Sequence, residues 1–144
     1  MNNQEKKAQI RRIFDLFNTR DFDGLDEIFH PEYVDHTPMG ELRGPEALKG
    51  FLRSWLAAFP DARFEVSNIV VEGDQAAWQV RFTATNTGSM MGMPPTGKAV
   101  DVLGIHMGRL ADNGQPIEHW TGNDLLVMMQ QLGLVPQMGA APTA

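Results

Sequence analysis

The apolar residues of this chain change their period near the middle of the sequence, and this change most narrowly limits the fold. Between residues 45 and 60 they recur at the spacing of one helical face, starting at Leu48 and ending at Phe59. After Asp61 the chain consists mostly of long runs with the residue types and turn signals of β-strands. Helices followed by consecutive antiparallel strands predict an α+β fold.

Boundary signals predict four helices, near residues 10–17, 21–29, 45–59 and 123–132. Asp21 is placed to cap the second helix, and proline at position 45 suits the first turn of the third. Asn123 or Asp124 is placed to cap the last helix, with Gly133 as the residue that ends it.

Five strands are expected, at residues 33–37, 63–72, 75–85, 99–110 and 115–121. Glycine-containing turns at 73–74 and 112–114 suggest two hairpins. The strand at 100–110 is apolar on both faces, and Leu103, Ile105 and Met107 share one of them. If the other face meets the helices, this one needs a partner, so we expect a homodimer packed sheet against sheet.

The segment 87–98 is a long connection between two expected strands and contains Met90, Met91 and Met93. Long loops are often functional, and methionine adapts to irregular apolar surfaces. Two interpretations stay open: a lid over an apolar ligand, or a loop packed against its own sheet or a partner subunit.

Composition excludes several function classes. The chain has 144 residues, which favours one domain, expected over 1–135 with a flexible tail at 136–144. A net charge of −6, from 12 basic and 18 acidic residues, argues against nucleic-acid binding. The absence of cysteine excludes disulfides, thiolate metal sites and a cysteine nucleophile. No apolar run is long enough to cross a membrane and the first residues do not form a signal peptide, so a cytoplasmic location is expected.

No cofactor or metal motif stands out. The four histidines are scattered without a metal-binding pair, and no glycine-rich phosphate loop or G-x-S-x-G nucleophile motif occurs. We therefore expect neither a cofactor nor a metal.

Four stretches of the chain, AFPDARFEV, VEGDQAAWQV, GMPPTGK and IEHWTGNDLLVMMQQLG, resemble the SnoaL-like polyketide cyclase and ester cyclase family. The resemblance extends from Ile10 to Gly133. It implies a cone-shaped α+β barrel of the nuclear-transport-factor-like type, in which a curved antiparallel sheet wraps around N-terminal helices and an internal pocket. It further implies a cofactor-independent enzyme that uses acid–base chemistry on a small apolar, oxygenated, polyketide-type molecule, as a cyclase or a related hydroxylase or isomerase. The alternative is a non-catalytic binding or accessory protein of the same fold.

Three residues are candidates for catalysis. The resemblance places His106 in the pocket as a general base, although it could equally be a core histidine. Adjacent strand residues face opposite ways, so only one of Asp35 and His36 can enter the pocket, and we choose His36. The acid of the ring-closing cyclases aligns with Thr121, which leaves Asp124 as the nearest carboxylate, unless that residue is only a helix cap.

Six further residues are expected to line the pocket and bind the substrate: Thr121, His119, Trp120, Trp55, Arg81 and Met91. Arg81 is either a surface charge or a buried guanidinium paired with Glu118. The tryptophans are expected in the core, where one could form a flat wall for a planar ligand.

Overall fold

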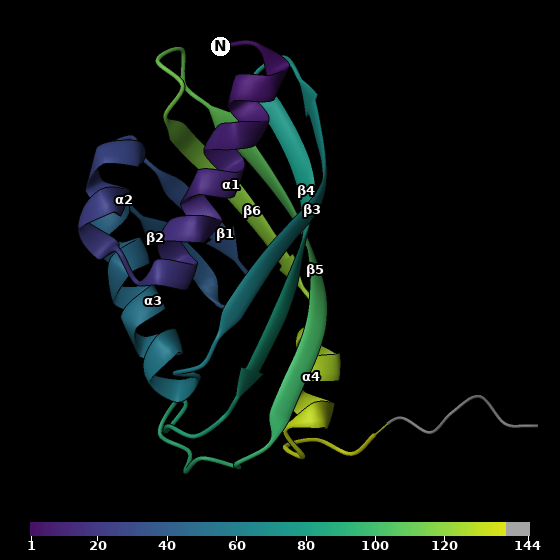
Figure 1. Cartoon of the computed structure of the whole chain (residues 1–144). Helices are drawn as coiled ribbons and strands as arrows, with labels where there is room; N and C mark the ends of the chain where they lie inside the picture. The colour runs from purple at the N-terminus through teal and green to yellow at the C-terminus, as the bar shows by residue number, and fades with distance from the viewer. Residues whose placement is uncertain (138–144) are drawn as a thin grey trace, which may run out of the picture.

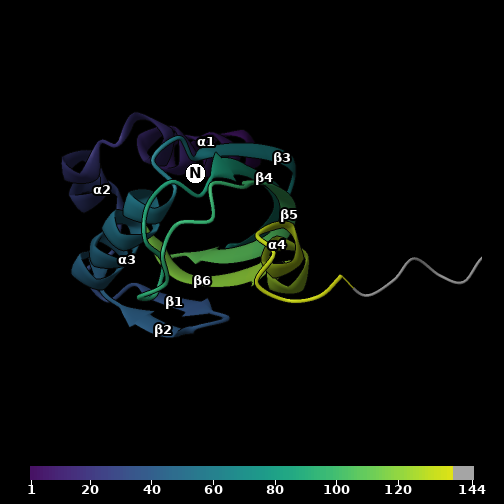
Figure 2. The same cartoon turned by 90° about the horizontal axis from the view of Figure 1, so that it is seen from below.

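One strongly curved sheet organises the chain (Figures 1 and 2). The computed structural model describes residues 1–137. Its elements, in chain order, are α1 (Asn3–Thr19), α2 (Phe22–Ile28), β1 (Val34–Thr37), β2 (Gly40–Arg43), α3 (Pro45–Ala58), β3 (Arg63–Glu72), β4 (Gln75–Thr85), β5 (Ala99–Leu110), β6 (Pro116–Asn123) and α4 (Leu125–Gln131). The predicted α+β class is confirmed, with four helices and a sheet whose long strands all follow α3.

The sheet curves without closing. Its six strands run in the order β2-β1-β6-β5-β4-β3, which leaves β2 and β3 as edges and β5 in the interior. The curved sheet implied by the resemblance is confirmed; it is open, and it departs from a purely antiparallel sheet only in the parallel pairing of β1 with β6. Seen from below, α3 lies on the open side of the sheet, where it packs against the edge strand β2 (Figure 2).

A β-bulge contributes to the curvature of the sheet. The register between β3 and β4 shifts between Ser67 and Val70, where Asn68 adopts a positive φ of 53°. Extra residues of this kind bend a strand and increase its twist. The bend lets the edge of the sheet follow α1, which packs along β3 (Figure 1).

The helices meet the sheet through the residues that their periodicity predicts. In α1 the buried side chains are Ile10, Ile13, Phe14 and Phe17, one stripe at helical spacing. Each contributes about 1.5–3 kcal/mol relative to exposure. Gly133, with a φ of 75°, ends the last helix as expected, and Asp21 and Asp124 cap α2 and α4.

The interior strand β5 alternates strictly between its two faces. Val100, Val102 and His106 are buried, whereas Leu103 and Ile105 are 50% and 52% exposed. The sequence pattern is thereby confirmed, and the side chain of His106 lies on the concave, inner face.

Two further expectations concern the ends and surface of the chain. No helix among residues 1–137 is long and apolar enough to cross a membrane. The predicted flexible tail, 136–144, lies almost wholly outside the described residues.

Candidate active site

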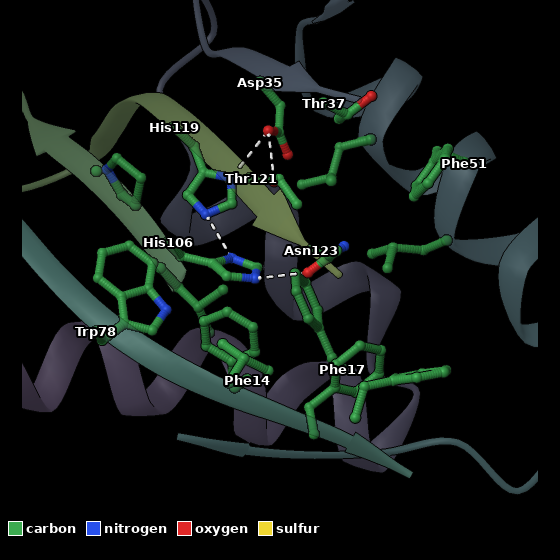
Figure 3. A pocket seen from close by; sticks show the side chains of 18 of the residues that line it. Phe14, Phe17, Asp35, Thr37, Phe51, Trp78, His106, His119, Thr121 and Asn123 are labelled. Carbon is green, nitrogen blue, oxygen red and sulfur yellow. Dashed lines mark hydrogen bonds and ion pairs between the residues drawn. The ribbon is translucent and has the colours of Figure 1, made fainter. Parts of the chain in front are cut away.

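A cavity of about 130 Å³ lies between the concave face of the sheet and the helices. Its walls are mainly apolar, with Phe14 and Phe17 from α1 and Phe51 and Trp55 from α3 (Figure 3). Six of its polar side chains come from three adjacent strands, β1, β6 and β5: Asp35, Thr37, His106, His119, Thr121 and Asn123. Apolar walls with a few convergent polar groups are typical of small-molecule sites.

The register of the strands gathers these polar groups. Along β6 the side chains of His119, Thr121 and Asn123 share the inner face because each is two residues from the next. The parallel pairing of β1 with β6 sets Asp35 opposite His119, and the antiparallel pairing with β5 sets His106 opposite Thr121. Residues far apart in the sequence thus become neighbours.

A continuous chain of hydrogen bonds joins four of these side chains (Figure 3). Asp35 Oδ1 lies 2.9 Å from His119 Nδ1, and His119 Nε2 lies 3.0 Å from His106 Nδ1. The chain ends where His106 Nε2 lies 3.2 Å from Asn123 Oδ1. We call these four residues the polar chain.

Asp35 is the charged end of the polar chain and is 5% exposed. Its Oδ1 also accepts from Thr121 Oγ1 at 3.1 Å, and its Oδ2 accepts from the Tyr33 hydroxyl at 3.2 Å. Burial alone would raise the pKa of Asp35, but the hydrogen bonds and the charge of His119 together hold it below its usual value. The carboxyl group is therefore ionised at neutral pH, in an otherwise apolar cavity.

The surroundings of His106 disfavour the charged form of its ring. Burial, followed by the charge of His119, lowers the pKa of His106 to about 3, although Asn123 and Asp35 oppose the shift. His106 is consequently neutral at neutral pH. Both of its ring nitrogens are within hydrogen-bonding distance of protein groups.

Aromatic rings enclose the two inner histidines. Trp78 stacks on His119 with ring centroids 5.5 Å apart, and Phe14 meets the His106 ring edge-on at 6.0 Å. Gly108 makes room for the indole, because a Cβ atom there would come within 2.9 Å of Trp78. Trp78 Nε1 is the one buried side-chain nitrogen or oxygen among residues 1–137 that has no hydrogen-bond partner.

Several predicted residues do line the cavity: His106, His119, Thr121 and Trp55. Asp124 borders it too, but its side chain accepts from Val127 N at 3.2 Å and caps α4. Asp124 is therefore a helix cap, which was the alternative role predicted for it.

His36 and Trp120 do not face the cavity, which corrects their predicted placement. Since Asp35 points inward, the next residue points outward, where His36 contacts Glu118 at 2.8 Å and Glu41 at 3.4 Å. Trp120 lies between two inward-facing residues of β6, is 37% exposed, and stacks on the His36 ring at 5.4 Å. The predicted convergence of His36 with His106 is wrong.

Arg81 and Met91 are also elsewhere. Arg81 lies on the outer face of β4 and pairs with Asp101 of β5, not with Glu118. Met91 is 63% exposed at the tip of the 87–98 loop. It lines an outer groove that shares Met39, Phe51 and Trp55 with the cavity.

Sequence reasoning missed Asp35 and Asn123. Alternation allowed either Asp35 or His36 to face inward, and only the long-range pairing with β6 decides between them. Asn123 was expected as a helix cap, but β6 continues through it. A carboxylate next to histidine in a short strand was the available signal for Asp35.

The family model of SnoaL-like polyketide cyclases matches residues 8–132 of this chain, which includes every residue of the polar chain. The chain belongs to the SnoaL-like polyketide cyclase family. This SnoaL-like protein is 31% identical over 131 residues to aklanonic acid methyl ester cyclase DnrD of Streptomyces peucetius, covering 86% of the chain and 88% of DnrD.

Solved structures agree with the family. The SnoaL-like protein is similar to IdmH, a proposed polyketide cyclase of Streptomyces antibioticus, with a TM-score of 0.79 and 31% identity over 89% of this chain and 98% of IdmH. It is also similar to AclR, a proposed hydroxylase of Streptomyces galilaeus, with a TM-score of 0.83 and 29% identity over 96% of this chain and 87% of AclR.

Proposed function

We propose that this protein is a cofactor-independent cyclase of small, apolar, polyketide-type esters, and that Asp35 is its general base. The observation that carries the proposal is a buried, ionised carboxylate on the wall of an apolar cavity. The similarity to an ester cyclase supports the class of substrate.

The proposed reaction begins at a carbon between a ketone and an ester carbonyl, where a C–H bond is acidic enough for a weak base. Asp35 takes this proton, and the electron pair of the C–H bond moves onto the carbonyl oxygen to form an enolate. The enolate carbon then bonds to a second carbonyl carbon of the same molecule, and the resulting alkoxide takes the proton back from Asp35. An apolar cavity strengthens the interaction of the enolate with any hydrogen-bond donor that faces it.

We assign the proton transfer to Asp35 rather than to His106, the predicted base. Both ring nitrogens of His106 have protein partners, so neither has a lone pair free to take a proton from a substrate. The carboxylate of Asp35 has further lone pairs on Oδ2, which receives only the Tyr33 hydroxyl.

A non-catalytic binding protein is the second candidate function. Thr121 favours it, because the resemblance aligns this position with the acid of the ring-closing cyclases and a hydroxyl group cannot take a proton from carbon. In this protein Thr121 instead donates to Asp35.

Conversion of aklanonic acid methyl ester, without added cofactor and with EDTA present, tests the proposal. Ring closure by an aldol step is an isomerisation, so a product of unchanged mass supports the cyclase. A product heavier by one oxygen atom would instead indicate a hydroxylase. Saturable binding without any product would establish the binding function.

We further propose that the protein forms a homodimer through the outer face of the sheet. Leu103, Ile105 and Met107 are 50%, 52% and 44% exposed there, next to Val70 and Trp120. Such side chains each contribute about 1.5–3 kcal/mol when buried. Ile105→Glu is expected to shift a dimer to monomer in sedimentation experiments without unfolding it; a wild-type species of 16.0 kDa would contradict the proposal.

A further inference from the structure

We infer that the side-chain amide of Asn123 donates a hydrogen bond to the anionic oxygen of the bound enolate, and that His106 is a positioning residue that orients this amide. The inference deepens the proposed function, because it names the group that receives the negative charge. It concerns two residues for which the cyclase proposal has no role.

Because Asn123 Oδ1 faces His106, the hydrogen bonds of the polar chain can run in one direction only, from His119 through His106 to Asn123. A carbonyl oxygen only accepts, so His106 Nε2 must carry a proton and donate across the 3.2 Å contact. A neutral His106 then has its lone pair on Nδ1, which must accept from His119 Nε2 at 3.0 Å.

The contacts at the other end of the polar chain hold the ring of His119 in place. With its proton on Nε2, His119 directs its other ring nitrogen, Nδ1, at Asp35 Oδ1 across 2.9 Å. Thr121 Oγ1 donates to the same carboxylate oxygen. The proton on His119 Nε2 thus fixes the tautomer of His106, and His106 in turn fixes the orientation of Asn123.

Gly104 leaves the space in which His106 and Asn123 meet. It lies on β5 directly opposite Asn123. A Cβ atom at this position would stand 2.5 Å from Asn123 Oδ1 and 3.1 Å from His106 Nε2. Any other residue at 104 would therefore force apart the two groups that set the amide orientation.

With its oxygen held by His106, Asn123 turns its amide nitrogen toward the open cavity (Figure 3). No acceptor in residues 1–137 receives a hydrogen bond from Asn123 Nδ2. On β6, Asn123 is the next inward-facing residue after Thr121, which contacts the proposed base. A substrate whose reacting carbon lies at Asp35 can thus place its carbonyl oxygen toward Asn123, where two N–H donors stabilise an enolate or a phenolate.

The test measures the binding of 2-naphthol, a planar apolar probe that ionises to an oxyanion without being turned over. We expect Asn123→Leu to lower the affinity for naphtholate about tenfold while leaving that for neutral naphthol nearly unchanged. Asn123→Asp keeps an acceptor for His106 but replaces the N–H donors with a charged oxygen, so its loss is expected to be larger. His36→Gln, on the outer face, is the matched control and keeps wild-type binding.

A double-mutant cycle separates the two roles. His106→Phe frees the amide to rotate and is expected to weaken naphtholate binding less than Asn123→Leu does. In the Asn123→Leu background the same substitution is expected to have no further effect. Wild-type protein that binds naphtholate no more tightly than Asn123→Leu, or a full His106 effect in both backgrounds, would overturn the inference. Because the probe is not converted, failure of the cyclase proposal leaves this result intact, and the reverse also holds.

Discussion

The two faces of the sheet carry the same kinds of side chain in two different chemical settings. On the inner face Asp35, His119 and His106 are joined by hydrogen bonds within an apolar cavity. On the outer face, one residue further along β1, His36 lies between two carboxylates near bulk water. The inner histidine has a pKa far below its ordinary value, and the outer groups hold ordinary ion pairs. Burial, rather than residue type, distinguishes the site from the surface.

The largest expected difference between the faces is in turnover. Asp35→Asn keeps the shape of the side chain but removes the base, so we expect kcat for aklanonic acid methyl ester to fall by about 10²–10⁴-fold. His36→Gln, the adjacent residue, is expected to leave kcat within about twofold. Equal effects from the two substitutions would remove the distinction between the faces.

The next effect is on stability against acid. His106 has a pKa of about 3 in the folded protein, whereas a histidine in an unfolded chain has a pKa of about 6.5. The folded state therefore binds fewer protons between these values, and stability is lost as the pH falls below 6.5. Between pH 7 and pH 5 the loss is about 2 kcal/mol.

Urea unfolding at several pH values measures this loss, with His106→Gln as the reference. The variant lacks the titrating group, so its free energy of unfolding should decline less steeply over the same interval. Parallel pH profiles for the two proteins would show that His106 is not held neutral by the fold.

The smallest effect is expected on the outer face. Arg81 and Asp101 form a close ion pair, yet their side chains are 54% and 53% exposed. Exposed pairs contribute little because water and salt screen them. A double-mutant cycle with Arg81→Ala and Asp101→Ala should give a coupling energy near the detection limit. A strong coupling would show that charges on the outer face interact as strongly as buried charges do.

Local patterns predicted much of the fold. The helical stripe that includes Phe14 and the alternation along β5 both act over a few residues, so the sequence determines them directly. The β2 strand was missed because its four residues, 40–43, have no apolar alternation and pair only with β1. The parallel pairing of β1 with β6 was likewise not predictable from local patterns, since it joins segments far apart in the sequence.

The site was only partly predictable for the same physical reason. His106, His119 and Thr121 were expected in the cavity, since the resemblance places His106 there and alternation along a long strand puts His119 and Thr121 on one face. Asp35 belongs to a strand of four residues, and its orientation follows from a pairing 84 residues away in the sequence. Asn123 required knowledge of where β6 ends.

The protonation states of the inner histidines test the account most directly. Nitrogen-15 NMR of the ring atoms distinguishes neutral tautomers from the charged form. We expect His106 to remain neutral from about pH 8 to pH 5, with its proton on Nε2, while His119 Nε2 also carries a proton. A His106 that gains a second proton near pH 6.5, or that carries its proton on Nδ1, would contradict the direction of the polar chain and the role of Asn123.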